Sequence, residues 1–271
     1  MKKAVIILFV LTLLFCSNLL AADVKGLIDD KSRLLEKEHH FDVVVIDPGH
    51  GGKDVGATSK DGTYEKKITL IVAKRLKSLI ESSIKNVKVY LTRTGDDSVS
   101  LRARARYANK MNADIFLSIH ANASEHLSIS GCETFFYEND ASDEQARLLA
   151  ELENQSGGFD EDKPENALEF ILMDMAKSEN ISLSYNFANV IQKEYVKSVK
   201  SRDRGVKQAP FTVLEGAKMP AVLTEIGFLS SKKDGSKLLD KNYLENIAKA
   251  LNKSIKRYKE ITGIKNGKAK K

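Results

Sequence analysis

Along most of the 271-residue chain, short apolar runs alternate with stretches in which apolar residues recur at the spacing of a helix. Residues 41–47, FDVVVID, form a short apolar and β-branched run that is typical of a buried strand. In residues 65–83, apolar side chains recur three and four positions apart, which is the spacing of one helix face. This order predicts a buried strand followed by an amphipathic helix.

The same alternation continues toward the C-terminus. It predicts strands at residues 87–93, 114–120, 132–138, 211–216 and 220–228, and helices at residues 101–111 and 237–261. Strands and helices that alternate at this spacing indicate an α/β fold. We therefore predict a single three-layer domain, in which a twisted mixed sheet of about six strands carries helices on both faces.

One segment, at residues 140–201, interrupts this alternation because it contains no strong strand pattern. The stretches DEQARLLAELENQSGG, NALEFILMDMAKSE and SLSYNFANVIQKEYVKSV predict three helices, and an acidic loop, FDEDKPE, follows the first. The segment is therefore either a helical crossover between two strands or an inserted regulatory element.

The N-terminus has the composition of a targeting sequence. A positive start, MKK, precedes an apolar run and the small residues Ala21 and Ala22, which predicts a secretory signal peptide over residues 1–22. The run is shorter than the roughly 20 residues of a membrane-spanning helix, so a retained anchor is only the alternative. The sequence leaves open whether cleavage follows Ala21 or Ala22, and Leu20 is not an ideal residue at the third position before a cut after Ala22. We expect an exported protein without stable membrane insertion.

The remaining composition adds boundaries and exclusions. We predict a linker at residues 23–40, the folded domain at residues 41–264 and a basic tail at residues 265–271. The net charge of +6 is not gathered into a basic stripe with interleaved aromatic residues, so a nucleic-acid partner is not expected. Signal cleavage would leave Cys132 alone, which excludes a disulfide framework. A monomer is the default expectation.

Four ionisable residues are predicted to gather at one edge of the sheet. His50 follows the first predicted strand, His120 ends the third and Glu225 lies near the end of the last, while Glu65 opens the first helix. In open α/β sheets, functional side chains collect outside the carboxyl ends of the strands. A single histidine there is often only a turn residue, but four such groups together indicate a site.

Two neutral imidazoles and one carboxylate form a set that holds one catalytic Zn²⁺ ion and leaves a position for water. A second glutamate that does not bind the metal can then transfer the water's proton to a leaving amine. This chemistry favours hydrolysis of an amide. We expect the glycines around His50 to let a bulky substrate approach the metal.

Other catalytic motifs are missing from the sequence. The phosphate loop G-x-x-x-x-G-K-[ST] does not occur, nor does the serine-hydrolase motif G-x-S-x-G or the zincin motif H-E-x-x-H. A nucleotide site would also leave His120 and Glu225 without a role.

Six segments resemble, in the same order, the signature segments of the type 3 N-acetylmuramoyl-L-alanine amidases: VVIDPGHGGKDVGA, YEKKITL, VYLTR, LRARARYAN, IFLSIHANA and PAVLTEIGFLS. The resemblance covers residues 42–261. It implies zinc-dependent hydrolysis of the amide between N-acetylmuramic acid and L-alanine in peptidoglycan. It also implies that His50, Glu65 and His120 bind the zinc ion and that Glu225 is the catalytic acid and base.

Three further residues fall within the family segments. The resemblance suggests that Arg93 and Arg102 hold anionic groups of the substrate, whereas structural pairing with Asp or Glu is the favoured alternative. Asn122 either contacts the substrate or caps a turn.

Residues 140–201 resemble the helical segment of autoinhibited division amidases in diderm bacteria. That resemblance implies that Glu153, or else Glu151, contacts the zinc and blocks the site until an activator protein displaces the helix. It further implies cell-wall remodelling during daughter-cell separation, in the periplasm, or at the cell wall if the organism has a single membrane. The alternative is a plain crossover helix with solvated glutamates.

Two other functions remain open from the sequence. A zinc peptidase acting on the peptide stems of peptidoglycan would need similar catalytic groups and a different substrate pocket. A non-catalytic wall-binding protein is the alternative from another class, although all four expected site residues are present.

Overall fold

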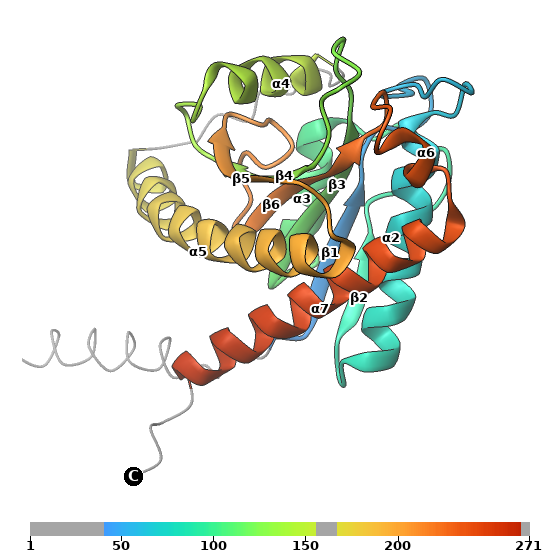
Figure 1. The fold of residues 1–271 in the computed structure, drawn as a ribbon. Coiled ribbons are helices and arrows are strands. Elements are labelled where there is room, and N and C mark those ends of the chain that lie inside the picture. Colours follow the sequence, from blue (N-terminus) through green and yellow to red (C-terminus); the bar gives the residue numbers. More distant parts are fainter. Residues whose placement is uncertain (1–40, 156–166, 267–271) are drawn as a thin grey trace, which may run out of the picture. The chain divides into compact units, whose positions relative to one another are not determined.

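The computed structural model of the chain describes the backbone of residues 41–155 and 167–266, and the side chains of residues 41–155 and 180–262. The predicted signal peptide and linker lie outside the described residues, as does most of the predicted tail. Phe41–Ile264 forms one compact unit by itself. Figure 1 shows this unit as a central sheet with helices packed around it.

Within the described residues, the sheet has six strands in the order β2-β1-β3-β6-β4-β5. The strands are β1 (Val43–Pro48), β2 (Lys88–Leu91), β3 (Ile115–Asn122), β4 (Cys132–Tyr137), β5 (Asp203–Ala209) and β6 (Ala221–Phe228). Neighbouring strands run parallel except β4 and β6, which are antiparallel. This mixed sheet confirms the predicted fold class.

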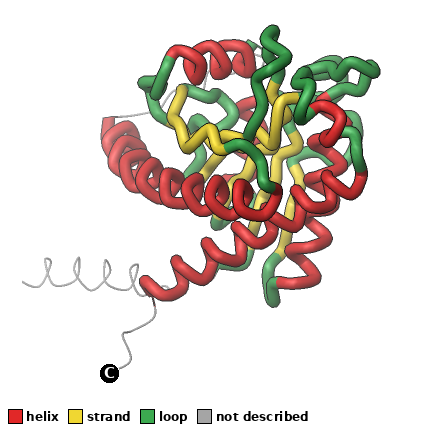
Figure 2. The backbone as a smooth tube through the Cα atoms, in the orientation of Figure 1, coloured by secondary structure: helices red, strands yellow, loops and turns green. Residues whose placement is uncertain are grey.

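Helices cover both faces of the sheet, as the colouring by secondary structure in Figure 2 makes clear. They are α2 (Glu65–Ser83), α3 (Leu101–Lys110), α4 (Glu144–Asn154), α5 (Ala167–Val199), α6 (Gly235–Leu238) and α7 (Lys241–Asn266). One hydrophobic core lies between the sheet and α2, α5 and α7. A second core lies between the other face and α3 and α4. The unit therefore has three layers.

Strand β1 shows why its sequence is continuously apolar. Val44, Val45 and Ile46 have no exposed surface. Val44 and Ile46 belong to the first core and Val45 to the second, because successive side chains point to opposite faces of a strand. A strand covered by helices on both sides needs apolar residues at every position.

The predicted strand at residues 211–216 is wrong. Residues 212–216 form turns, and the apolar side chains of Phe211 and Leu214 are buried in the second core. The strand that pairs with β4 is β5, which has a polar sequence, DRGVKQA. Because β5 is an edge strand and only half-buried, it lacks the apolar run that marks the other strands.

Helix boundaries also differ from the sequence-based expectation. The last two helices predicted in residues 140–201 are one continuous helix, α5. The predicted C-terminal helix is divided into α6, which ends at Leu238, and α7, which begins at Lys241. Asp240 caps the start of α7, because its carboxylate accepts a hydrogen bond from the Tyr243 amide at 2.8 Å. Among the helices described, none has both the length and the apolar character required to span a bilayer.

Candidate metal and catalytic site

The four ionisable residues come together at the carboxyl edge of β1, β3 and β6. His50 lies two residues beyond β1, and Glu65 is the first residue of α2. His120 in β3 and Glu225 in β6 are partners in the register of the two parallel strands. Because paired residues on neighbouring strands lie on the same face of the sheet, the register itself brings His120 and Glu225 together.

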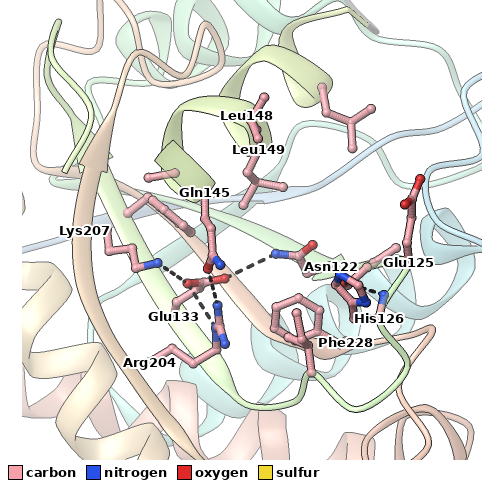
Figure 3. A pocket seen from close by; sticks show the side chains of 16 residues that line it. Asn122, Glu125, His126, Glu133, Gln145, Leu148, Leu149, Arg204, Lys207 and Phe228 are labelled. Atoms are coloured by element: carbon pink, nitrogen blue, oxygen red, sulfur yellow. Dashed lines mark hydrogen bonds and ion pairs between the residues drawn. The ribbon is translucent and has the colours of Figure 1, made fainter. Parts of the chain in front are cut away.

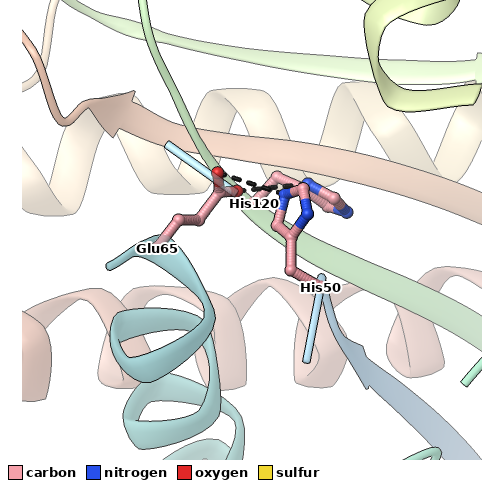
Figure 4. Close-up of side chains that lie close together, drawn as sticks. All are labelled: His50, Glu65 and His120. Carbon is pink, nitrogen blue, oxygen red and sulfur yellow. Dashed lines mark ion pairs between the residues drawn. The ribbon is translucent and has the colours of Figure 1, made fainter. Parts of the chain in front are cut away.

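The carboxylate of Glu65 faces both imidazole rings (Figure 4). One of its oxygens, Oε2, is 3.1 Å from Nε2 of His50, and the other, Oε1, is 3.2 Å from Nδ1 of His120. The two imidazole rings have centroids 4.8 Å apart and an interplanar angle of 70°. All three side chains are buried.

Hydrogen bonds fix the orientation of these side chains. Nδ1 of His50 lies 2.8 Å from Oδ2 of Asp54, so the ring proton on Nδ1 can be donated to that carboxylate and Nε2 keeps a lone pair toward the site. The amides of Ala57 and Ala121 donate to the two oxygens of Glu65 at 2.8 and 2.7 Å. Asp54 was not singled out from the sequence, although it lies on the glycine-rich loop that follows His50.

The donor set fits a zinc ion. One ligand atom each of His50, Glu65 and His120 lies within 4.8 Å of the other two. Nε2 of His50 and Nδ1 of His120 are buried, and neither has a hydrogen-bond partner among the described residues. Buried polar atoms are normally satisfied, so two imidazole nitrogens that face one carboxylate indicate a position for a cation.

The carboxylates and imidazoles of this cluster shift one another's pKa values strongly, even without a metal ion. Burial alone would raise the pKa of Glu65, but the nearby His50 and His120 rings hold it below its ordinary value. Burial opposes protonation of His50, yet the carboxylates of Glu65 and Asp54 raise its pKa to about 11. A cation is therefore strongly favoured at this position, whether it is a proton or a metal ion.

Glu225 has a different environment from Glu65. Its side chain is completely buried, and neither carboxylate oxygen has a hydrogen-bond partner among the described residues. Burial raises the pKa of Glu225 well above its ordinary value, and the carboxylates of Glu65 and Glu153 raise it further. A buried carboxyl group with a raised pKa binds a proton more readily than an ordinary glutamate, which suits a group that accepts and returns one.

Helix α4 places one further carboxylate in the cluster. Oε2 of Glu153 lies 3.3 Å from Nδ1 of His120 and 3.5 Å from Nε2 of His50. Ligand atoms of His120, Glu153 and Glu225 also lie within 4.8 Å of one another. Glu151, the second candidate from the sequence, is exposed and forms an ion pair with Arg147. The structure therefore brings Glu153 to the histidines and leaves Glu151 on the surface.

The glycines near His50 make room for protein side chains. A Cβ atom on Gly49 would lie 2.4 Å from Nε2 of His120, and one on Gly56 would lie 2.5 Å from Cδ2 of His50. Gly49 and Gly56 are therefore required for the packing of protein side chains, while the approach of substrate past the glycines stays a prediction. They allow the two imidazole rings and Glu65 to pack closely.

Arg93 and Arg102 both have structural partners. Arg93 is buried, and its guanidinium donates to the carbonyls of Pro48 at 2.9 Å and Gly49 at 2.8 Å, so it holds the loop that carries His50. Arg102 lies 2.9 Å from Glu215 in a partly exposed ion pair. Arg102 thus has the acidic partner that the structural alternative expected, whereas Arg93 has backbone carbonyls as partners instead of Asp or Glu.

A second buried arginine, Arg104, supports the same loop, and the sequence pattern did not predict its role. Nη1 of Arg104 lies 2.7 Å from Oδ1 of Asp47, and Nη2 donates to the His50 carbonyl at 2.9 Å. Ser118 and Thr92 donate hydroxyl hydrogen bonds to the same aspartate. Of the three arginines in and after LRARA, the alternating sequence does not mark Arg104 as the buried one, whereas Arg102 is partly exposed and Arg106 is exposed.

Asn122 ends β3 and is buried. Its side-chain amide donates to Oε1 of Glu133 at 3.3 Å, and its carbonyl accepts from the Leu229 amide at 2.7 Å. No pattern in the sequence marks Glu133 as a site residue. It is the register partner of Glu225 on the neighbouring strand β4, so it extends the row of ionisable side chains across the sheet.

A mixed α/β sheet that gathers two histidines and several buried carboxylates at one edge defines an α/β protein with a candidate zinc-hydrolase site. The sequence matches the family Amidase_3, described as N-acetylmuramoyl-L-alanine amidase, over residues 44–257. This chain belongs to that family.

Curated relatives agree with the family. The chain is 35% identical over 220 residues to the N-acetylmuramoyl-L-alanine amidase AmiC of Escherichia coli O6:H1, a match that covers 80% of this chain and 52% of AmiC. It is 32% identical over 220 residues to AmiA of Escherichia coli K12, covering 80% of this chain and 75% of AmiA. The chain therefore spans about half the length of the AmiC relative.

Solved structures share the fold. The catalytic domain of the amidase CwlV from Bacillus (Paenibacillus) polymyxa var. colistinus aligns with a TM-score of 0.62 and 30% identity, covering 81% of this chain and 98% of that domain. CwlD from Clostridioides difficile, solved in complex with the GerS lipoprotein, aligns with a TM-score of 0.61 and 29% identity, covering 81% of this chain and 99% of CwlD.

Proposed function

We propose that this protein is an exported, zinc-dependent amidase that hydrolyses the bond between N-acetylmuramic acid and L-alanine in peptidoglycan. Its membership of the amidase family supports the reaction. The observation that carries the zinc assignment is the convergence of His50, Glu65 and His120, with two buried imidazole nitrogens that have no hydrogen-bond partner in the described part of the chain.

His50, Glu65 and His120 would hold the ion, and Asp54 keeps the His50 ring in the orientation that ligation needs. When bound, zinc lowers the pKa of a water molecule to about 7 and makes hydroxide available at neutral pH. Glu225 takes the proton of the attacking water and returns it to the leaving L-alanine amine. Its buried position and unpartnered oxygens support this role.

We further propose that Glu153 inhibits the enzyme in the conformation described. A carboxylate oxygen 3.3 Å from His120 and 3.5 Å from His50 takes the space that a water molecule and the scissile amide need. Helix α4 must then move before substrate is hydrolysed. An activator protein that displaces α4 and a role in daughter-cell separation are predictions of the family resemblance. Export is predicted from the N-terminal sequence, which lies outside the described residues.

Digestion of purified sacculi tests the reaction. If the protein is an amidase, mass spectrometry of the products identifies free stem peptides that begin at L-alanine. Products cleaved within the stem would instead establish the alternative, a zinc peptidase. Metal analysis of the same preparation is expected to give one zinc ion per chain, and a metal-free active enzyme would refute the zinc assignment.

A further inference from the structure

Four charged side chains form a cluster beside the candidate site and take no part in the proposed hydrolysis. The cluster consists of Glu133 in β4, Arg204 and Lys207 in β5, and Asp143 at the N-terminus of α4. Nζ of Lys207 lies 3.0 Å from Oε2 of Glu133 and 3.2 Å from Oδ2 of Asp143. Nε of Arg204 lies 3.3 Å from the same oxygen of Glu133.

The cluster lies one strand away from the proposed acid and base. Glu133 and Glu225 are register partners in the antiparallel pair of β4 and β6, which places their Cβ atoms roughly 5 Å apart. Asn122, two residues after His120, donates to Glu133 from the other side. A substrate bound at the zinc would therefore reach this cluster with a group close to the scissile amide.

Three members of the cluster, Glu133, Arg204 and Lys207, line a cavity of about 370 Å³ (Figure 3). Glu133, Arg204 and Lys207 lie on one side of it, and Leu149 of α4 lies on the opposite side. The loop after β3, with Ser124 and Glu125, forms a further part of the wall. Because α4 supplies part of the lining, displacement of this helix would widen the cavity toward the proposed zinc site.

Charge is balanced in the cluster only while α4 is in place. Two cations, Arg204 and Lys207, face two carboxylates, Glu133 and Asp143. Glu133 is only 3% exposed and stays with the sheet, whereas Asp143 belongs to the helix. If α4 moves away, the sheet retains one positive charge without a partner. A site with one surplus positive charge favours binding of one anion.

Both cations contact the first turn of α4. Lys207 contacts the N-cap residue Asp143, and Nη2 of Arg204 donates to Oε1 of Gln145 at 3.1 Å. Nε of Arg204 and Oε2 of Glu133 are buried without hydrogen-bond partners among the described residues, so their ion pair lacks hydrogen-bond geometry. The arginine therefore retains a donor for another acceptor.

We propose that Arg204 and Lys207 form a subsite for a carboxylate on the peptide of the substrate, and that Asp143 occupies this subsite while α4 covers the site. The inference rests on the proposed function and adds to it a determinant of substrate specificity. Helix α4 then competes with substrate at two points, with Glu153 at the histidines and with Asp143 at the cations. The carboxylate expected here belongs to the residue that follows L-alanine in the stem peptide.

Two soluble probes test the subsite. N-acetylmuramoyl-L-alanyl-D-glutamate carries a free α-carboxylate on its last residue, and N-acetylmuramoyl-L-alanyl-D-isoglutamine carries an amide in its place. Both probes keep the γ-carboxylate, so the comparison isolates the α-carboxylate. Calorimetric titration into zinc-loaded Glu225→Gln measures their binding with little or no turnover. We expect Asp143→Asn, added to this background, to raise the affinity for the free acid about tenfold and to leave that for the amide unchanged. Asparagine caps a helix as well as aspartate, so α4 is retained.

The matched control is Glu144→Gln, because it removes the same charge from the next residue of α4. Glu144 is exposed and pairs with Arg147, so neither affinity should change. Lys207→Met is expected to abolish the preference for the free acid without altering binding of the amide. The melting temperature of each variant establishes that it is folded.

Several results would overturn the subsite. The first two are that the two probes bind with equal affinity in every variant, or that neither probe binds. The third is that Glu144→Gln changes the affinities as much as Asp143→Asn does. The fourth is that Lys207→Met weakens the binding of both probes equally. A different result would refute the proposed function: digestion of sacculi by the wild-type protein would release no peptide that begins at L-alanine. A lysine-dependent preference for the free acid would still establish the subsite in that case.

Discussion

Glu153 of helix α4 holds a carboxylate oxygen 3.3 Å from Nδ1 of His120, at the carboxyl edge of the sheet. The side chain is only 9% exposed, and burial raises its pKa while the carboxylate of Glu65 raises it further. Keeping three glutamates beside two histidines is electrostatically costly without a cation, since like charges repel strongly where water is excluded. A metal ion between these groups would offset that cost.

Glu153→Ala is expected to increase basal hydrolysis of purified sacculi about tenfold or more, because each tenfold corresponds to only about 1.4 kcal/mol of lost inhibition. Dye release from labelled sacculi measures the rate. Glu151→Ala is the matched control, since Glu151 lies two residues away and pairs with Arg147 on the surface. Equal basal rates for Glu153→Ala and the wild type would refute inhibition by Glu153.

Glu225→Gln is expected to lower kcat by about 10²- to 10⁴-fold, which is the usual contribution of a general acid and base. The amide has the same shape as the carboxyl group and no charge to bury, so the melting temperature should stay the same or rise. Zinc content should not change. Steady-state kinetics with a soluble muropeptide and metal analysis test these outcomes, and full activity of the variant would exclude Glu225 as the acid and base.

Removal of zinc should destabilise the protein, because a bound ligand stabilises the folded state by about 4 kcal/mol at 1,000 times its Kd. We expect a chelator to lower the melting temperature and added Zn²⁺ to restore it. His120→Ala should abolish zinc binding and this response, whereas His126→Ala, a change at an exposed histidine, should preserve both. A melting temperature that is insensitive to zinc in the wild type would contradict the site.

Arg93 and Arg102 should differ in their effects on stability. Arg93→Met removes charged hydrogen bonds to buried carbonyls of the His50 loop and should cost about 2 to 3 kcal/mol of unfolding free energy. Arg102→Met breaks a partly exposed ion pair and should cost less than about 1 kcal/mol. Urea denaturation measures both variants. If the two variants lose a similar amount of unfolding free energy, the buried hydrogen bonds of Arg93 do not stabilise the protein more than the ion pair of Arg102 does.

The pair of Asp47 and Arg104 predicts a dependence of stability on pH. Burial alone would raise the pKa of Asp47, but Arg104 and the hydroxyls of Thr92 and Ser118 hold it below its ordinary value. A lowered pKa in the folded state stabilises the protein above the unfolded value, about 3.9. This contribution is lost as the pH falls through the lower, folded-state pKa.

Asp47→Asn should therefore destabilise the protein by about 3 kcal/mol at pH 7, because it leaves Arg104 as an uncompensated buried charge. The difference from the wild type should decrease as the pH falls below about 3.9. Asp97→Asn, a change at an exposed aspartate, should alter stability by less than about 0.5 kcal/mol at any pH. Urea denaturation at several pH values measures these differences. If the difference between Asp47→Asn and the wild type does not depend on pH, Asp47 does not have the lowered pKa described here.

The sequence by itself determined the parts of the molecule that depend on local pattern. Strand β1 was visible because both of its faces are buried, and α2 because one of its faces is apolar. His50, Glu65, His120 and Glu225 were found as a group because the carboxyl ends of neighbouring strands in an open sheet lie along one edge. That rule requires only the order of strands and helices, which the hydrophobic pattern supplies.

Only the tertiary structure decided the contacts between segments that are distant in the chain. The polar edge strand β5 has no apolar run, so neither its pairing with β4 nor the inward direction of Lys207 was predictable from local pattern. The partners of Arg104 and the choice of Glu153 over Glu151 likewise depend on how helices pack on the sheet. Packing fixes the rotation of a helix about its axis, and that rotation decides which glutamate reaches the histidines.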